Sequence, residues 1–287
     1  MKDNQINNGR DKISNLIIFI DNFIQEIIIY IKKISFYFLY IFSKKYFFLK
    51  KNENLKNKFA NEKIFILGLA PSINNCDFTK FENKNVIMIN RSFRLKEYEI
   101  LKPKFHLFID NKLALGIWPI SFIDEVFKKN PDIIIFLNAK WYYLEKFRKY
   151  RNHNQIYWVK FHPVSLFNGK YSYDFTKSIS TGSTVIECAI SLSVYLGSKD
   201  INILGVEGNG ISKLMCNQDS HWDGKDSDYR QHNSLLYAND MINSSRGIRQ
   251  WHVISKKLKN VNVNIYNLSK EGILDAYPYK SFEDATK

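Results

Sequence analysis

The stretch that decides the fold is residues 180–210, which read Ser-Thr-Gly-Ser-Thr-Val-Ile-Glu-Cys-Ala-Ile-Ser-Leu-Ser-Val-Tyr-Leu-Gly-Ser-Lys-Asp-Ile-Asn-Ile-Leu-Gly-Val-Glu-Gly-Asn-Gly. A loop of small residues comes first, an apolar helical pattern covers 185–196, and a buried strand pattern over 201–207 ends in glycines. A helix that turns directly into a buried strand predicts half of a nucleotide-binding α/β unit. The polar segment that contains His221 follows soon afterwards.

Further strand patterns precede and follow this unit. They cover 63–72, 85–90, 103–110, 132–138 and 263–267, and a helical pattern at 121–129 lies between two of them. Because strands alternate with helices, we expect an α/β fold with a Rossmann-like, mostly parallel sheet and helices on both faces. A chain of 287 residues is long enough for one such domain and an appendage.

Polar residues recur where the predicted strands end. They are Ser72, Asn90, Asp110, Asn138, Glu207 and Asn267. Each alone could be a turn former. In an open parallel sheet, however, the carboxyl ends of the strands line the ligand crevice, so six such residues together predict a binding site at that edge.

The N-terminal residues 13–49 differ from the rest of the chain. They are apolar and aromatic, but Asp21, Glu26 and the pair Lys32-Lys33 interrupt them too often for a typical membrane span, and no signal-peptide cleavage site follows. Polar positions that share one helical stripe are Asn15, Asn22, Glu26 and Lys33. We therefore expect an amphipathic helical segment in domain 1–60, followed by a catalytic domain over 61–287.

Two interpretations of the N-terminal segment remain open. With lysines directly after it, the segment would lie in the interface of an anionic membrane. Alternatively, a helical hairpin would pack on the catalytic domain or on a second subunit, which makes a homo-oligomer conceivable. Membrane association is favoured because the basic flank follows directly, and residues 50–61 resemble a solvated linker.

Charge and cysteine content narrow the classes of function. The formal net charge of +14 predicts anionic partners, but no arginine-rich block or nucleic-acid-binding spacing occurs, so nucleic acid is disfavoured. Three scattered cysteines without a Cys-x-x-Cys pair fit a reducing cytoplasm. No GxSxG, HExxH or Walker A sequence is present, which disfavours serine hydrolases, zinc proteases and P-loop kinases.

His221 is the candidate for chemistry. It lies in a polar, acidic segment without periodicity, where an imidazole could act as a general base or could be an ordinary surface histidine. The neighbouring carboxylates Asp219, Asp223, Asp226 and Asp228 could bind Mg²⁺, although their spacing does not match an EF-hand loop.

Residues 63–285 resemble the bacterial lipooligosaccharide sialyltransferases and a related group, the hydroxymethylpterin pyrophosphokinase-like (MptE-like) proteins. The motifs that carry the resemblance are Gly68-Leu69-Ala70-Pro71-Ser72, Asn90-Arg91-Ser92, the strand from Pro103 to Asp110, Gly182-Ser183-Thr184-Val185, the run 196–207 and the tail 266–274. In the sialyltransferases a segment similar to Asn217-Gln-Asp-Ser220-His221-Trp222-Asp-Gly224 supplies the catalytic base.

The resemblance implies an inverting, metal-independent glycosyltransferase of surface-glycan synthesis. His221 would activate an acceptor sugar hydroxyl, which attacks a CMP-activated nonulosonic acid. The residues implied for substrate and nucleotide binding are Gly68, Pro71, Ser72, Asn90, Arg91, Asp110, Asn111, Thr181, Gly182, Ser183, Glu207, Ser220 and Tyr229.

Three features depart from the pattern. Leu69 replaces a usual Asn, Glu207 replaces an Asp, and the expected leaving-group tyrosines are missing from 208–218, where Tyr229 or Lys213 could substitute.

The expected partners are therefore a CMP-sugar donor, a glycan or lipid-linked acceptor and the inner-membrane surface, with no cofactor and a cytoplasmic, peripherally membrane-associated location. Two other functions stay open. One is Mg²⁺-dependent pyrophosphoryl transfer from ATP to a pterin-like alcohol, with the ion on Asp110, on Glu207 or on the carboxylates of residues 219–228. The other is a non-catalytic protein that kept the fold.

Overall fold

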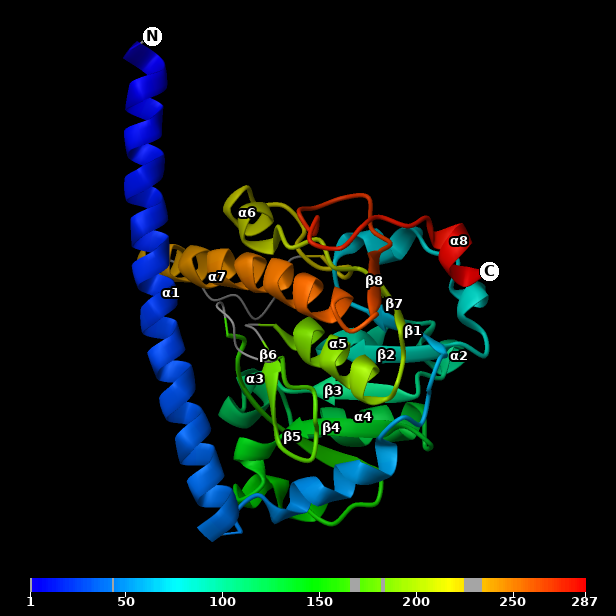
Figure 1. Cartoon of the computed structure of the whole chain (residues 1–287). Coiled ribbons are helices and arrows are strands. Elements are labelled where there is room, and N and C mark those ends of the chain that lie inside the picture. Colours follow the sequence, from blue (N-terminus) through cyan, green and yellow to red (C-terminus); the bar gives the residue numbers. More distant parts are fainter. Residues whose placement is uncertain (1, 43, 166–170, 182–183, 225–233) are drawn as a thin grey trace.

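The computed structural model describes the backbone of residues 2–42, 44–165, 171–181, 184–224 and 234–287, and the side chains from residue 12 onward within these ranges. Eight parallel strands form one sheet in the order β6-β5-β4-β3-β2-β1-β7-β8 (Figure 1). The strands are β1 (Lys63–Leu67), β2 (Asn85–Ile89), β3 (Phe105–Phe108), β4 (Ile134–Asn138), β5 (Ile156–Pro163), β6 (Ser178–Thr181), β7 (Asp200–Leu204) and β8 (Asn264–Asn267). The predicted Rossmann-like α/β class is confirmed.

The strand order reverses direction once. From β1 the chain builds outward through β2 to β6, and then returns to add β7 and β8 on the other side of β1. The carboxyl ends of β1 and β7 therefore form the topological switch point, where ligands bind in open α/β sheets.

Six of the eight strands were predicted from sequence, and β5 and β6 were not. Lys160, His162 and Pro163 interrupt the apolar pattern of β5, and β6 is only the polar tetrapeptide Ser-Ile-Ser-Thr. Most of β5 and all of β6 are nevertheless buried, and their polar side chains bond to each other: the Nδ1 atom of His162 lies 2.9 Å from the Ser178 hydroxyl.

Helices cover both faces of the sheet. On one face, α5 (Val185–Tyr195) and α7 (Ser234–Lys259) pack over Ile64 and Ile66. On the other face, α2 (Tyr98–Leu101) and α4 (Phe122–Lys129) pack over Phe65 and Leu67. The remaining short helices are α3 (Asn111–Leu115), α6 (Gly210–Met215) and α8 (Phe282–Thr286). Six 3₁₀ segments complete the described elements: η1 (Phe47–Leu55), η2 (Pro71–Asn75), η3 (Phe78–Phe81), η4 (Asn90–Arg94), η5 (Ala139–Trp141) and η6 (Glu145–Tyr150).

The segment expected to be a solvated linker packs on the sheet instead. In η1, Leu49, Asn52 and Leu55 are buried. The Asn52 amide donates to the carbonyl of Trp158 at 2.9 Å and to that of Phe175 at 2.6 Å. Buried apolar side chains at 49 and 55, together with an asparagine that pairs with buried backbone carbonyls, outweigh the polar composition of residues 50–61.

The N-terminal segment is one continuous helix, α1 (Lys2–Phe42), and not a hairpin. Three residues of its polar stripe, Asn22, Glu26 and Lys33, are half-buried toward the α/β domain, whereas Asn15 is exposed. The neighbouring Asp21 carboxylate pairs with Arg246 at 2.7 Å and with Arg249 at 3.3 Å, both on α7. These arginines lower the pKa of Asp21 below its usual value, with the hydrogen bond from Arg246 as the largest cause. Farther along the helix, Ile29 and Phe36 are buried against the domain.

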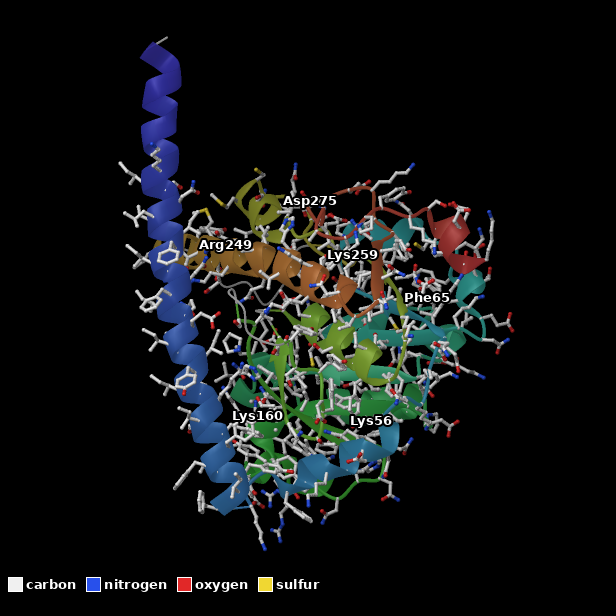
Figure 2. All side chains as sticks on the ribbon, viewed as in Figure 1. Lys56, Phe65, Lys160, Arg249, Lys259 and Asp275 are labelled. Atoms are coloured by element: carbon white, nitrogen blue, oxygen red, sulfur yellow. The ribbon has the colours of Figure 1, made fainter. Side chains whose placement is uncertain are left out.

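The outward side of α1 is apolar, and Figure 2 shows its side chains pointing away from the domain. The exposed residues include Ile13, Ile17, Phe19, Ile20, Phe23, Ile24, Ile27, Ile31, Ile34, Phe38 and Phe42. A helix on a water-soluble domain normally buries its apolar side and exposes its polar side. Here the arrangement is reversed. By length and composition, Lys12–Phe42 is also apolar enough to cross a membrane, despite the charges that disfavoured a span in the sequence.

Candidate functional site

The loops after β1 and β7 meet at very close range. A Cβ atom on Gly68 would lie 2.2 Å from the carbonyl oxygen of Gly205, so only glycine fits there. Gly205 itself has a φ of 69°. Its N–H donates to the Ser269 hydroxyl at 3.1 Å, and the Ser72 hydroxyl donates to the same oxygen at 3.1 Å. These contacts lock the ends of β1, β7 and β8 together.

Glu207 completes this lock. Its buried carboxylate accepts a hydrogen bond from the Ser72 N–H at 2.9 Å and pairs with the Lys213 ammonium on α6. Its carbonyl accepts from the Ile273 N–H at 2.7 Å. A Cβ atom on Gly272 would lie 2.2 Å from that carbonyl oxygen, and the φ of Gly272 is 98°. The Gly-rich turn and the 266–274 tail are therefore built around the same acidic residue.

The turn after β1 also positions His221. The Leu69 carbonyl accepts a hydrogen bond from the Trp222 N–H at 2.7 Å, and the Asn74 amide donates to the Trp222 carbonyl at 2.9 Å. His221 and Gly224 exchange two backbone hydrogen bonds, at 3.0 and 3.1 Å, which closes a tight turn. Gly224 has a φ of 105°, a conformation that favours glycine.

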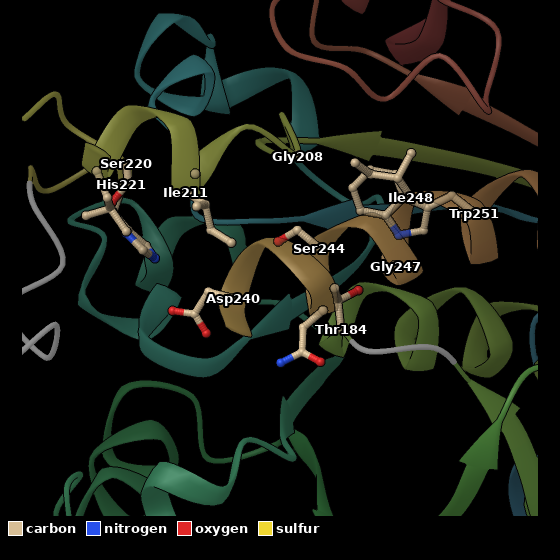
Figure 3. Close-up of a pocket in the computed structure, with 13 residues that line it drawn as sticks. Thr184, Gly208, Ile211, Ser220, His221, Asp240, Ser244, Gly247, Ile248 and Trp251 are labelled. Carbon is tan, nitrogen blue, oxygen red and sulfur yellow. The ribbon is translucent and has the colours of Figure 1, made fainter. Parts of the chain in front are cut away.

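His221 lines a cavity of about 310 Å³ between α6 and α7, here called the histidine cavity. Figure 3 shows Ser220, His221 and Asp240 toward one end of it and Trp251 toward the other. The Ser220 hydroxyl lies 3.0 Å from Nδ1 of His221, so it orients the imidazole ring. Thr184, at the start of α5, forms part of the wall.

A second cavity of about 250 Å³, the strand-end cavity, lies over the carboxyl ends of β3, β4 and β6. Its polar lining consists of Asp110, Asn111, Asn138, Lys140, Thr181 and Thr184. Asp110 and Asn138 occupy equivalent places: each accepts a hydrogen bond from the N–H two residues later, at 3.0 and 3.1 Å. These turns hold both side chains at the edge of the sheet, as the sequence pattern predicted.

Several buried polar atoms near this edge have no hydrogen-bond partner among the described residues. They include the Oδ1 of Asn90 and the Oγ1 of Thr181. Burying a polar atom without a partner costs free energy, so such atoms mark places where a ligand or water would complete the bonding. Thr181 lines the strand-end cavity, and Asn90 follows β2 directly.

His106, on the neighbouring strand β3, holds the backbone of Asn90 in position. Its Nε2 lies 2.8 Å from the Asn90 carbonyl, which can only accept, so Nε2 carries the proton. Nδ1 then accepts from the Tyr98 hydroxyl at 3.0 Å. Burial lowers the pKa of His106 to about 3, because the charged imidazolium would have to leave water. The neutral ring supports Asn90 in a left-handed conformation with a φ of 47°.

The residues expected at the site thus fall into three groups. Ser220 and His221 line the histidine cavity, and Asp110, Asn111 and Thr181 line the strand-end cavity. Gly68, Pro71, Ser72, Asn90, Arg91 and Glu207 lie at strand ends but line neither cavity; Pro71 opens η2, and Arg91 is buried in η4. Gly182, Ser183 and Tyr229 lie outside the described residues.

Sequence reasoning missed Thr184, Lys140, Asp240 and Trp251 as lining residues. Asp240 and Trp251 belong to α7, whose mixed polar and apolar sequence gives only a weak helical pattern. Lys140 follows the predicted strand end Asn138 by two residues and could have been found from it.

A metal site is not assembled within the described part of the chain, where no three His, Cys, Asp or Glu side chains are grouped closely enough to hold an ion. Asp219 and Asp223 belong to that part, whereas Asp226 and Asp228 do not. Lys213, one candidate for the missing leaving-group tyrosines, is already paired with Glu207.

Comparisons with known proteins place the chain in a family. No curated protein matches its sequence. Among solved structures, it is similar to that of the MAf glycosyltransferase from Magnetospirillum magneticum AMB-1, with 12% identity and a TM-score of 0.42 over 84% of this chain. The chain spans 40% of the length of that protein. The family described as 6-hydroxymethylpterin diphosphokinase MptE-like matches residues 42–208, more than half of the sequence, and the chain therefore belongs to the MptE-like family.

Proposed function

We propose that the protein is an inverting glycosyltransferase that moves a sugar, most specifically a nonulosonic acid, from a CMP-activated donor to a hydroxyl acceptor. The observation that carries the proposal is the meeting of two cavities at Thr184. One contains a histidine with an orienting hydroxyl, and the other contains the polar strand ends that suit a nucleotide. A donor that lies across Thr184 would place its reactive carbon between them.

The strand-end cavity suits the nucleotide. Asp110 and Asn111 offer acceptors and donors for ribose or base edges, and the Thr181 hydroxyl lacks a partner among the described residues. Lys140 supplies a positive charge for the phosphate. In this proposal Gly68, Ser72 and Glu207 shape the site. Ser72 donates its N–H to Glu207 and its hydroxyl proton to Ser269, and Gly68 lies against the Gly205 carbonyl.

His221 would act as the general base. Its imidazole accepts the proton of the acceptor hydroxyl while that oxygen forms a bond to the anomeric carbon of the donor. The bond between that carbon and the CMP phosphate oxygen breaks at the same time, and the phosphate leaves with the electron pair. Attack on the face opposite to the leaving group inverts the configuration. Ser220 is a positioning residue in this scheme, because it contacts His221 and not the reacting atoms.

The reversed polarity of α1 supports a place at a membrane surface. Asp21 and Phe36, which both contact the domain, are separated by about 22 Å along the helix. A helix held against the domain over this length would lie in the plane of the interface, with its isoleucines and phenylalanines in the lipid. We therefore propose a cytoplasmic enzyme attached peripherally to the inner membrane, with a glycan or lipid-linked acceptor.

The family description favours a second candidate, pyrophosphoryl transfer from ATP to a hydroxymethylpterin-like alcohol. That reaction would use Mg²⁺ to neutralise the phosphates. Carboxylates from Asp110 and from the 219–228 segment would then hold the ion.

Thermal unfolding of the full-length protein with nucleotides separates the two candidates. CMP, CDP, UDP, GDP and ATP would each be added with and without Mg²⁺. We expect CMP to raise the unfolding temperature without metal, because binding to the folded state alone stabilises it. Stabilisation only by ATP with Mg²⁺ would overturn the glycosyltransferase proposal and favour pyrophosphoryl transfer.

A further inference from the structure

A third cavity lies between α1 and the sheet edge formed by β5 and β6. Its volume is about 370 Å³, and Figure 2 shows Lys160, one of its lining residues, beside α1. The lining has two parts. Apolar groups come from α1 and β5, including Ile31, Phe36, Leu39 and Phe161, and the cationic groups are Lys32, Lys140 and Lys160. We call it the lysine cavity.

The three lysines share this space without a counter-charge. The cavity lining contains no Asp or Glu, and none of the three ammonium groups has a carboxylate within ion-pair distance among the residues described. Elsewhere Lys149 and Lys177 are paired with Asp124 and Asp174, respectively. Lys160 is half-buried, whereas Lys32 and Lys140 are exposed beside it. Like charges brought together repel each other, so the arrangement costs stability unless an anion binds.

Lys160 is the most buried of the three lysines. Its ammonium lies 5.2 Å from the ring centre of Tyr46. The pKa of Lys160 is lowered to about 8, with burial as the largest cause, and the positive charges of Lys140, Lys45 and Lys32 contribute to this lowering. An anion among these ammonium groups would reverse the electrostatic part of that effect.

The residues around the lysine cavity indicate which kind of molecule would supply the anionic group. The cavity adjoins the outward side of α1, where Ile31, Ile34 and Phe38 are exposed. Lysine ammonium groups bind phosphate as point charges, and an apolar wall suits hydrocarbon. We propose that the lysine cavity binds the phosphate group of a membrane lipid, whose hydrocarbon chain lies along the apolar side of α1. The proposal concerns binding and holds whichever group the enzyme transfers.

The lysine cavity adjoins the strand-end cavity, and this matters for the enzyme. Lys140 and Phe161 line both the lysine cavity and the strand-end cavity. A lipid phosphate held by Lys32 and Lys160 would therefore lie next to the proposed nucleotide site.

Vesicle flotation with the full-length protein tests the proposal. Vesicles of phosphatidylcholine alone would be compared with vesicles that contain about one-fifth phosphatidylglycerol or a long-chain isoprenyl phosphate. The variant Lys32→Gln/Lys160→Gln removes two cavity charges. The matched control Lys44→Gln/Lys50→Gln removes two exposed charges near the same end of α1. Salt at about 0.5 M would screen the exposed lysines more strongly than the half-buried Lys160.

At this salt concentration we expect the cavity variant to lose about tenfold or more of the affinity gained from the phosphate lipid, and the control to lose less than about threefold. Binding to phosphatidylcholine alone would be the same for all variants. Comparison of the two lipids identifies the better source of the phosphate. Equal losses in the cavity variant and the control would overturn the proposal, as would full competition by millimolar inorganic phosphate. If Lys160→Gln lowers the unfolding temperature, Lys160→Met keeps the aliphatic stem and provides the same test.

Discussion

The two halves of the sheet edge are built on opposite principles. At the ends of β1, β7 and β8, the polar groups of Ser72, Glu207 and Ser269 bond to protein groups, and glycines allow the loops to touch. At the ends of β2 and β6, buried oxygens of Asn90 and Thr181 have no partner among the described residues. A polar residue after a strand can therefore either bond within the protein or keep its polar atom available for a ligand. Its neighbouring residues determine which of the two occurs.

The largest expected effect comes from His221. The bonded half of the sheet edge, at β1, β7 and β8, positions this residue, and the open half would bind the donor substrate next to it. His221→Ala should lower the turnover number about a hundredfold to ten-thousandfold, because a general base is lost. His252→Ala is the matched control: this histidine is exposed on α7 and lies 3.4 Å from the Asp275 carboxylate. Steady-state kinetics and nucleotide titration would be measured together. Unchanged turnover in His221→Ala would remove this residue from the mechanism.

The close contact of the bonded half gives the next prediction. Gly272→Ala places a Cβ atom 2.2 Å from the Glu207 carbonyl oxygen at a φ of 98°. We expect the free energy of unfolding to fall by about 3 kcal/mol or more, since backbone must move. Gly116→Ala serves as control: its φ is 77° but nothing lies within 4 Å, so only about 1–2 kcal/mol of backbone strain applies. Equal losses in urea unfolding would show that the Glu207 contact is unimportant.

Two buried histidines make the stability depend on pH. The pKa values of His106 and His162 are each lowered to about 3, with burial as the largest cause. Between about pH 6.5 and 3 the unfolded chain binds protons at these sites and the folded chain does not. Stability is therefore full above about pH 6.5 and falls on acidification.

Well below pH 6.5 the expected slope approaches about 1.4 kcal/mol per pH unit for each histidine, which urea unfolding at about pH 5.5 and pH 4 would measure. His106→Gln should roughly halve the slope, whereas His252→Gln should leave it unchanged. A wild-type stability that is flat across this range would contradict the neutral, buried state of both rings.

The smallest expected effects come from removing a single hydroxyl group in each half of the sheet edge, and they compare the two halves directly. Thr181→Val keeps the side-chain shape and removes the hydroxyl whose oxygen lacks a described partner. We expect about tenfold weaker nucleotide binding and little change in stability. Ser269→Ala should do the opposite: stability falls by about 1–2 kcal/mol, because the Gly205 N–H loses its acceptor, and nucleotide affinity stays the same. Calorimetric titration and unfolding curves for both variants would be compared. If both variants showed the same changes in nucleotide affinity and in stability, the two halves of the sheet edge would not differ in the way described.

Much of this fold could be predicted from sequence, since long apolar runs between glycines and polar residues leave few alternatives. Asp110 and Asn138 were found because a polar residue after a buried strand has a fixed place in a parallel sheet. Residues of α7 such as Asp240 could not be found in this way. They reach the histidine cavity through a tertiary contact between helices, and no local pattern encodes that contact.

The N-terminal helix shows the same limit. Its polar stripe was visible in the sequence, but a stripe does not say which side faces the domain. The pairing of Asp21 with Arg246, distant in the chain, decides the orientation. Likewise, the polar composition of residues 50–61 suggested a linker, and the buried hydrogen bonds of Asn52 place it in the core.

The most direct test of the account is backbone amide hydrogen exchange of the full-length protein with and without CMP. The account predicts that CMP slows exchange most in peptides that cover 105–112, 138–141 and 178–186, next to the strand-end cavity. Peptides that cover 68–75 and 263–274 would change little, because their polar groups are already bonded within the protein. Protection centred on these two segments instead would place the nucleotide at the β1–β7 junction and contradict the division of the sheet edge into a bonded and an open half.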